Sequence, residues 1–211
     1  KASHPTYAPL ASQSAPAARD LRRELGLPAD APVLLFFGFV RPYKGLEYLI
    51  QAMARIRQRL PVHLLVAGEF WSSREFYERY AREFGVEQHI SFVDRYIPNE
   101  ELQPYFELAD VVVLPYVSAT QSGVAQLAFG FGKPVITTRV GGLAEVVQEG
   151  VNGLLVPPQD EAALADAVVR FFSDGLGERI GEQMRAGGAA SYSWEELVQA
   201  LECVTRELRQ P

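Results

Sequence analysis

The chain has 211 residues, of which 48% are apolar and 22% are charged, a balance typical of a globular protein with a full hydrophobic core. Its formal net charge of −6 argues against a general electrostatic grip on nucleic acid or on an anionic membrane, while a local basic pocket remains compatible with it. The single cysteine, Cys203, excludes an internal disulfide framework and a cysteine-cage metal site. We therefore expect one large domain in a reducing, cytoplasmic compartment.

The first 18 residues are rich in Pro, Ala and Ser and show no apolar periodicity, which predicts a linker or tail. From residue 19 onward, short runs of Val, Leu, Ile and Phe alternate with stretches of helical period. The apolar runs predict six strands, at 33–37, 63–67, 90–93, 111–114, 134–138 and 152–156. Helices are expected after them, at about 45–59, 72–84, 98–109, 123–131 and 143–149.

Three further helices are predicted at the end of the chain, at about 160–173, 175–186 and 193–209. The last of them begins with Ser193 and has Glu196 three residues on, the spacing of a capping box. Strands that are each followed by a helix imply a Rossmann-like, doubly wound parallel sheet with helices on both faces and extra C-terminal helices. Ligands of such α/β folds bind at the carboxyl ends of the strands, near the switch point.

The loop after the first strand carries two cations between two glycines, in the sequence GFVRPYKG. Gly38 and Gly45 let the backbone approach a ligand closely, while Arg41 and Lys44 lie just before a helix, whose N-terminal amides favour anions. Arg can grip two oxygens and Lys acts as a point charge, so the loop is suited to a diphosphate. Two solvated loop cations are the alternative, which the position at the mouth of the sheet disfavours. Neither a dinucleotide fingerprint nor an NTPase phosphate loop is present.

The loop after the fourth strand ends at a second helix start. Thr120 or Ser122 is the expected N-cap, and Ser122, Gly123 and Val124 would offer free amides to an anion. A well-capped helix with no further role is the plainer interpretation, and the position across the switch point from the basic loop favours the functional one. Gly141-Gly142, at the end of the fifth strand, is equally compatible with a tight turn and with a ligand contact.

Other candidates for chemistry are few. His4, His63 and His89 lie away from the carboxyl ends of the strands, so we interpret them as surface or structural residues. No Asp-x-Asp pair is present to hold a divalent metal, and no nucleophile elbow occurs. Trp71 follows Gly68-Glu69 and could line a cleft, although core packing is the expectation.

These residues, in this order, resemble the nucleotide-binding half of a GT-B glycosyltransferase of the retaining family called glycosyl transferases group 1, or family four. The resemblance covers about residues 20–209 and is most specific in LLFFGFVRPYKGLEYLIQAM, ADVVVLPY and FGKPVITTRVGGLAEVVQEGVNGLLVPPQD. It implies that Arg41 and Lys44 hold the donor diphosphate as catalytic residues and that Gly38 admits the donor. It also implies that the backbone of Tyr96 and Ile97 meets the nucleobase, and that the amides of Ser122, Gly123 and Val124 hold the distal phosphate.

One departure from the family concerns two glutamates that usually stand eight positions apart around the last of these loops. One approaches the transferred sugar and the other holds the ribose. Alignment on FGKPV puts Ala119 and Leu127 at those positions, and neither side chain accepts a hydrogen bond. Gln121 or Gln126 could substitute, while Leu127 lies on an apolar stripe and is expected in the core.

The resemblance also implies that an N-terminal acceptor domain is missing, so we interpret 1–18 as the end of an interdomain linker and 19–211 as a C-terminal domain. The expected function is transfer of a sugar from a nucleotide-diphosphate sugar, with retention and without metal or other cofactor. Its partners would be the nucleotide sugar and the missing half, through which alone the protein would meet a membrane. Alternatives are a non-catalytic nucleotide-sugar sensor or degenerate partner subunit and, less favoured, a nicotinamide oxidoreductase.

Overall fold

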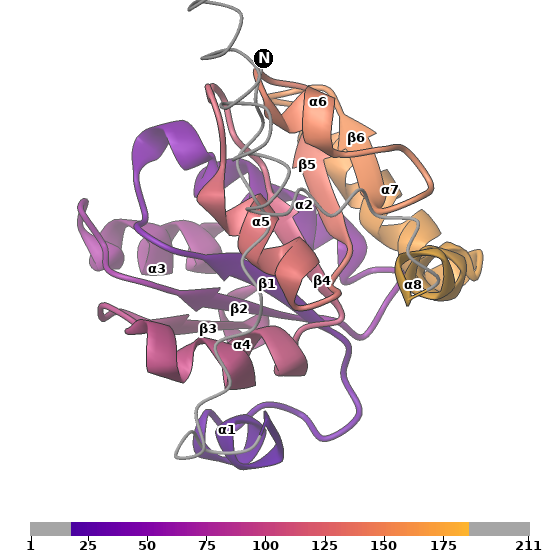
Figure 1. The fold of residues 1–211 in the computed structure, drawn as a ribbon. Coiled ribbons are helices and arrows are strands. Elements are labelled where there is room, and N and C mark those ends of the chain that lie inside the picture. The colour runs from indigo at the N-terminus through magenta and orange to yellow at the C-terminus, as the bar shows by residue number, and fades with distance from the viewer. Residues whose placement is uncertain (1–17, 186–211) are drawn as a thin grey trace, which may run out of the picture.

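The structure is a computed structural model that describes residues 18–185 and forms an α/β sandwich around one twisted sheet (Figure 1). Residues 1–17 of the predicted tail, the predicted helix at 193–209 with its Ser193 capping box, and Cys203 lie outside the described residues, while Ala18 is the first residue of a helix. Within the described part, no helix is both long and apolar enough to cross a membrane.

The sheet has six parallel strands in the order β3-β2-β1-β4-β5-β6, which confirms the predicted fold class. Each strand lies within one residue of its predicted range: β1 Val33–Phe37, β2 His63–Ala67, β3 Ile90–Val93, β4 Val111–Leu114, β5 Val135–Thr138 and β6 Gly153–Val156. β1 pairs with β2 on one side, through Leu35 opposite Leu65, and with β4 on the other, through Leu34 opposite Val111. The strand order therefore reverses between β1 and β4, and the carboxyl ends of these two strands form the switch point.

The helices agree with the prediction, with two differences. They are α1 Ala18–Glu24, α2 Leu46–Ile56, α3 Arg74–Glu83, α4 Leu102–Leu108, α5 Gly123–Gly130, α6 Leu143–Val146, α7 Glu161–Ser173 and α8 Leu176–Arg185. The helix expected at 98–109 begins as a 3₁₀ turn, Asn99–Glu101, before α4 starts. The first helix, α1, was not predicted, because its seven residues are too short and too charged to show an apolar period.

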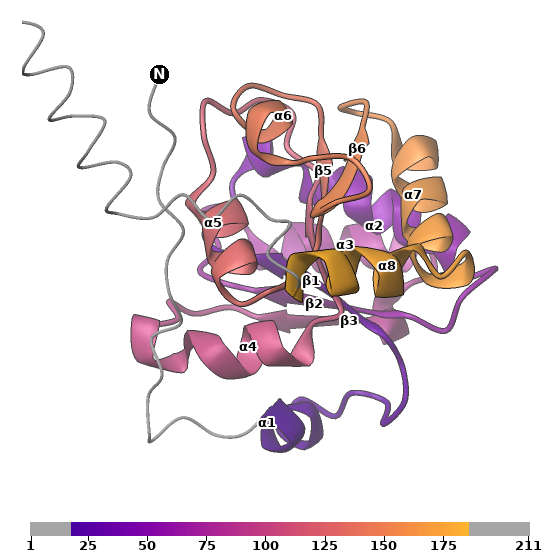
Figure 2. The ribbon, with the colours of Figure 1, turned by 45° about the vertical axis from the view of Figure 1, so that its right-hand side comes forward.

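Alternation along the strands divides the core into two layers. Leu34 and Phe36 of β1 pack toward α2, α3, α7 and α8, whereas Leu35 and Phe37 pack toward α1, α4, α5 and α6. Both layers are closed by fully buried side chains, as expected for parallel strands covered on two faces. Figure 2 shows α1 lying outside α4, farther from the sheet than the other helices of its layer.

Two buried threonines of β5 fix the chain that leaves β4. The hydroxyl of Thr137 donates to the carbonyl of Leu114 (2.8 Å), and that of Thr138 donates to the carbonyl of Tyr116 (2.5 Å). Buried hydroxyls must find such partners, so these bonds specify one path for the loop. The loop after β4 therefore reaches the switch point in a defined position.

Candidate functional site

The loops after β1 and β4 touch each other through their backbones. Gly45 adopts the left-handed conformation (φ 68°), and a Cβ at this position would lie 2.1 Å from the carbonyl oxygen of Pro115. The amide of Val117 donates to the carbonyl of Tyr43 at 2.8 Å. Glycine is needed here both for its dihedral angles and for its lack of a side chain. The contact brings the basic loop beside the chain that leads to α5.

A pocket of about 320 Å³ lies at this switch point. Eight of the nine residues singled out from the sequence line it: Gly38, Lys44, Tyr96, Ile97, Gln121, Ser122, Gly123 and Val124. The rest of the wall is largely apolar or aromatic, from Phe37, Phe39, Tyr43, Gly68, Glu69, Asn99, Leu102, Tyr116 and Leu127. Four separate loops and a helix start thus converge on one cavity, although their roles toward a ligand remain predictions.

Lys44 is the buried cation of this pocket. It is 6% exposed, and its Nζ lies 3.4 Å from the carbonyl oxygen of Phe37 and 5.7 Å from the ring of Tyr116. A Cβ at Gly38 would lie 3.1 Å from this Nζ and 3.4 Å from the side chain of Val124. Gly38 therefore leaves the space in which the ammonium group and the start of α5 come together.

The electrostatics of Lys44 favour an anion beside it. Burial, and then the nearby charge of Arg41, lower its pKa to about 8. The ammonium group is still mostly protonated at neutral pH, but the protein solvates it poorly. An anion in the pocket would supply the missing counter-charge.

Arg41 is the one predicted site residue that does not line the pocket. Its guanidinium carbon lies 3.6 Å from the ring centroid of Trp71, a cation–π contact, and 5.9 Å from that of Phe39. Its Nε is buried without a hydrogen-bond partner. Arg41 thus lies at the rim of the pocket, close enough to Lys44 to lower the pKa of that residue.

The start of α5 has the predicted cap. Ser122 is the N-cap, and its hydroxyl oxygen accepts a hydrogen bond from the amide of Ala125 (3.3 Å). The amides of Gly123 and Val124 are in the first turn, where no intrahelical acceptor exists. Both residues line the pocket, so the positive end of the helix dipole points to the same region as Lys44.

The Gly141-Gly142 turn supports this loop from behind and does not line the pocket. The amide of Gly142 donates to the carbonyl of Thr120 at 2.9 Å. A Cβ at Gly141 would lie 1.7 Å from the carbonyl oxygen of Ala119. Of the two alternatives for this turn, the structure favours tight packing.

Exposed aromatic rings form the outer rim of the pocket. Phe39 lies 5.6 Å from Trp71 and 6.5 Å from Tyr96, measured between ring centroids. Trp71 is 62% exposed, so the expectation that it packs in the core is wrong. The loop after β2 turns outward, since its backbone pairs with the β1 loop through Val40 and Phe70.

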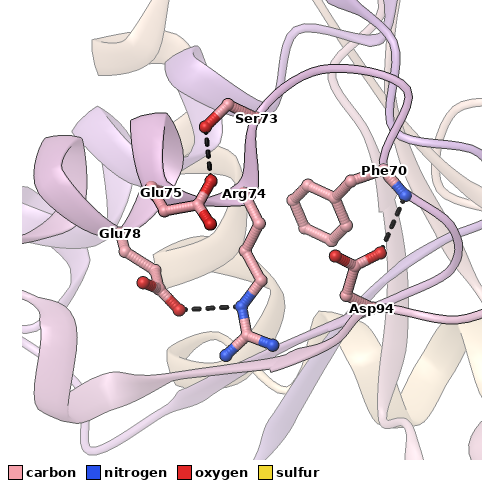
Figure 3. A network of polar contacts seen from close by, with 6 residues as sticks. All are labelled: Phe70, Ser73, Arg74, Glu75, Glu78 and Asp94. Atoms are coloured by element: carbon pink, nitrogen blue, oxygen red, sulfur yellow. Dashed lines mark hydrogen bonds and ion pairs between the residues drawn. The ribbon is translucent and has the colours of Figure 1, made fainter.

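A polar network holds the loop that carries Trp71 (Figure 3). Asp94, after β3, accepts a hydrogen bond from the amide of Phe70 at 3.0 Å. On α3, Arg74 pairs with Glu78 at 2.7 Å, and the hydroxyl of Ser73 donates to Glu75 at 2.5 Å. The Ser73 hydrogen bond, more than any other contact, lowers the pKa of the Glu75 carboxyl.

The structure shows the surroundings of Leu127, one of the two positions at which the family usually has a glutamate. Leu127 is partly buried: it packs against the core layer, as expected, and it also forms part of the pocket wall. Helix α5 is apolar on nearly every side, so the spacing of its apolar residues does not show which face is buried. Its buried residues are Ala125, Gln126 and Ala128. Gln126 is 3% exposed and does not line the pocket, whereas Gln121 does.

The remaining apolar residues of the pocket wall were not predicted from the sequence. Phe39 and Tyr43 lie inside the basic loop itself, and their apolar character between two glycines was the available indication. Tyr116 is 2% exposed, and burial raises the pKa of its phenol well above the ordinary value. Among residues 18–185, no cluster of three or more His, Cys, Asp or Glu side chains could hold a metal ion.

The fold is that of the C-terminal half of a GT-B glycosyltransferase, and comparison with known proteins agrees. Sucrose-phosphate synthase from Thermosynechococcus elongatus is similar over 95% of this chain and 51% of its own, with 32% identity and a TM-score of 0.73. Anabaena HepE in complex with UDP-glucose shares the fold over 90% of this chain and 52% of its own, at a TM-score of 0.75 and 22% identity.

The family follows from the sequence comparisons. Residues 31–174 match the family described as glycosyl transferases group 1, and this chain belongs to it. D-inositol 3-phosphate glycosyltransferase of Corynebacterium urealyticum is 35% identical over 199 residues, which are 91% of this chain and 47% of the relative. The chain thus spans about half the length of the curated relatives that it matches.

Proposed function

We propose that this chain is the donor-binding half of a retaining glycosyltransferase that transfers a hexose from a nucleotide-diphosphate sugar. The observation that carries the proposal is the convergence of Lys44 Nζ, the glycine at 38 and the first turn of α5 on one pocket at the switch point. The complex of HepE with UDP-glucose supports a donor of this kind. An N-terminal half would supply the acceptor site, with 1–18 as the end of the linker to it.

In this proposal the pocket stabilises the leaving group. As the bond between sugar and diphosphate breaks, negative charge grows on the diphosphate oxygens. Lys44, Arg41 and the amides of Gly123 and Val124 stabilise that charge, which lowers the barrier to transfer. They take the role that a divalent cation plays in other enzymes, so no metal and no cofactor is needed. The backbone of Tyr96 and Ile97, at the opposite wall, receives the base.

A double substitution in this chain tests whether Arg41 and Lys44 bind the diphosphate. Arg41→Ala with Lys44→Ala should weaken UDP binding by about a hundredfold, because two charge-assisted contacts are lost. Uridine, measured by the same calorimetric titration, should bind as it does to the unchanged protein. The matched control is Lys133→Ala, which removes a cation that does not line the pocket. Equal losses of UDP and uridine would refute the proposal.

The alternative is a non-catalytic nucleotide-sugar-binding protein or degenerate partner subunit. Leu127 in the pocket wall favours it, because no carboxylate is available at that position to hold the ribose. Donor turnover by the full-length protein separates the two: release of UDP that depends on an acceptor supports transfer, and tight donor binding without turnover supports the alternative. The anomeric configuration of the product, read by NMR, tests retention.

A further inference from the structure

A second cavity, of about 410 Å³, lies at the opposite, amino end of the sheet. It is open to solvent and is lined by the loop before β1, the end of α2, the start of β2 and the turn before β3. Its lining residues are Pro28, Ala29, Asp30, Ala31, Arg57, Pro61, Val62, His63 and His89. It shares no residue with the pocket at the switch point.

Two nitrogen atoms of residues that line this cavity are buried and have no hydrogen-bond partner. They are Nε of Arg57 and Nδ1 of His63. His63 is 6% exposed, and its other ring nitrogen, Nε2, lies 3.0 Å from the hydroxyl of Ser91. A buried donor without a partner costs free energy, so it calls for an explanation.

The charges that act on His63 are positive, while the lining itself carries one cation, Arg57, and one acid, Asp30. Arg57 makes only long hydrogen bonds, to the carbonyl oxygens of Leu60 (3.4 Å) and Val62 (3.3 Å), and forms no ion pair within residues 18–185. Burial first, then the charges of His89, Arg57 and Arg22, lower the pKa of His63 to about 4. Two acids oppose this field: Asp30 in the wall and Glu87 beside His89.

We propose that this cavity binds a small phosphate-bearing anion, held by Arg57, His63 and His89. Arg57 supplies the charge and a fork of N–H donors suited to phosphate oxygens. His63 can donate while neutral in the tautomer in which the Ser91 hydroxyl donates to Nε2 and the ring proton is on Nδ1. A small shift of the wall that exposes the two buried nitrogens would then let the anion pair with both, without a change in the protonation of His63.

The second wall of the cavity is fixed by hydrogen bonds within the protein. Arg22 donates from Nη1 to the carbonyl oxygens of Pro28 (2.5 Å) and Ala31 (3.0 Å), which fixes the loop before β1. The amide of His63 donates to the carbonyl of Pro32 at 2.8 Å. A preformed wall reduces the ordering cost of binding.

Titration with inorganic phosphate, at constant ionic strength and in the presence of saturating UDP, tests the proposal. Binding should move the NMR signals of the His63 and His89 rings, assigned with His63→Gln and His89→Asn. Arg57→Gln should weaken phosphate binding by about tenfold or more. Arg59→Gln, an exposed cation of the same helix end that pairs with Asp166 at 2.9 Å, is the matched control and should leave binding unchanged.

Two further variants keep the test independent of folding and of the first pocket. Ser91→Ala should weaken phosphate binding, because Nδ1 then loses its preference for the proton; His89→Asn is the variant to use if Arg57→Gln does not fold. Lys44→Ala should leave phosphate binding intact. The proposal is wrong if the histidine signals do not move, if UDP displaces phosphate, or if Arg57→Gln and Arg59→Gln weaken binding equally. Glycerol 3-phosphate tests whether the cavity accepts an organic phosphate.

Discussion

The two ends of the parallel sheet both hold poorly paired cations, but they are built differently. At the carboxyl end the loops approach one another through glycine backbones, and helix amides lie beside Lys44. At the amino end, side chains make the contacts, as Arg22 and His63 do around the second cavity. Where loops meet through their backbones, main-chain N–H groups remain available to a ligand. Where side chains make the contacts, most of their N–H groups are already hydrogen-bonded and only a few have no partner. The first end therefore depends on glycines and the second on side chains.

The largest effect is expected from Gly45→Ala. A methyl group there meets the carbonyl oxygen of Pro115 at 2.1 Å, and φ is 68°. The loops after β1 and β4 must then separate, so we expect a loss of several kcal/mol in the free energy of unfolding and loss of UDP binding. Urea unfolding and calorimetric titration measure the two effects.

Gly85→Ala is the matched control for this change. Gly85 has nearly the same backbone angle, φ 66°, but a Cβ there meets no atom within 4 Å. It should cost only the conformational strain of about 1 kcal/mol and leave UDP binding unchanged. If the two substitutions lower the free energy of unfolding equally, the close approach of the two loops does not determine the structure of the carboxyl end of the sheet.

At the amino end, the next largest effect is a dependence of stability on pH. The pKa of His63 is about 4 in the folded protein and about 6.5 when unfolded, so the unfolded state binds more protons between these values. Stability is then complete above pH 6.5 and falls by up to about 3 kcal/mol as the pH drops to 4. His63→Gln should flatten this part of the stability profile. An unchanged acid slope in His63→Gln would show that other groups cause it.

At the carboxyl end, the corresponding pH effect is on binding. The pKa of Lys44 is lowered to about 8, so the ammonium group loses its proton as the pH rises from 7 to 9.5. UDP affinity should fall by about tenfold over this range, because the charge that meets the diphosphate disappears. Lys44→Ala should bind weakly at every pH, while Lys133→Ala should retain the fall. A fall that survives in Lys44→Ala would assign the titration to another group.

The same contrast explains what the sequence could predict. The six strands, their helices and the residues that meet at the switch point follow from apolar runs, four of which end directly before a Gly or Pro, and these are local features. Trp71 was misplaced because a neighbouring element determines its burial: pairing of Val40 with Phe70 turns it outward. The place of Leu127 in the pocket wall was not predicted, because an almost wholly apolar helix does not show which face lines the pocket.

The second cavity could not be predicted from the sequence, for a related reason. Arg57, His63 and His89 lie on three elements and form no motif. Their interest comes from orphan donors, which only three-dimensional geometry reveals. Side-chain sites of this kind have no spacing rule, whereas the glycine-bounded basic loop has one.

The smallest effect concerns Trp71, a side chain at the carboxyl end that lies against a cation. Its ring lies 3.6 Å from the guanidinium carbon of Arg41, and such a contact contributes about 0.5 to 2 kcal/mol. Trp71→Ala should therefore weaken UDP binding by about three- to tenfold, with Trp71→Phe in between. Phe76→Ala, which removes an exposed ring that does not line the pocket, should have no effect.

A double-mutant cycle decides whether Trp71 acts through Arg41. In an Arg41→Ala background, Trp71→Ala should cause no further loss of UDP affinity, because the group that the ring orients is gone. Loss of the same size in both backgrounds would mean that Trp71 contacts the ligand itself. The carboxyl end would then bind its ligand partly through an exposed aromatic side chain, and its reliance on backbone contacts would be less complete than the glycines suggest.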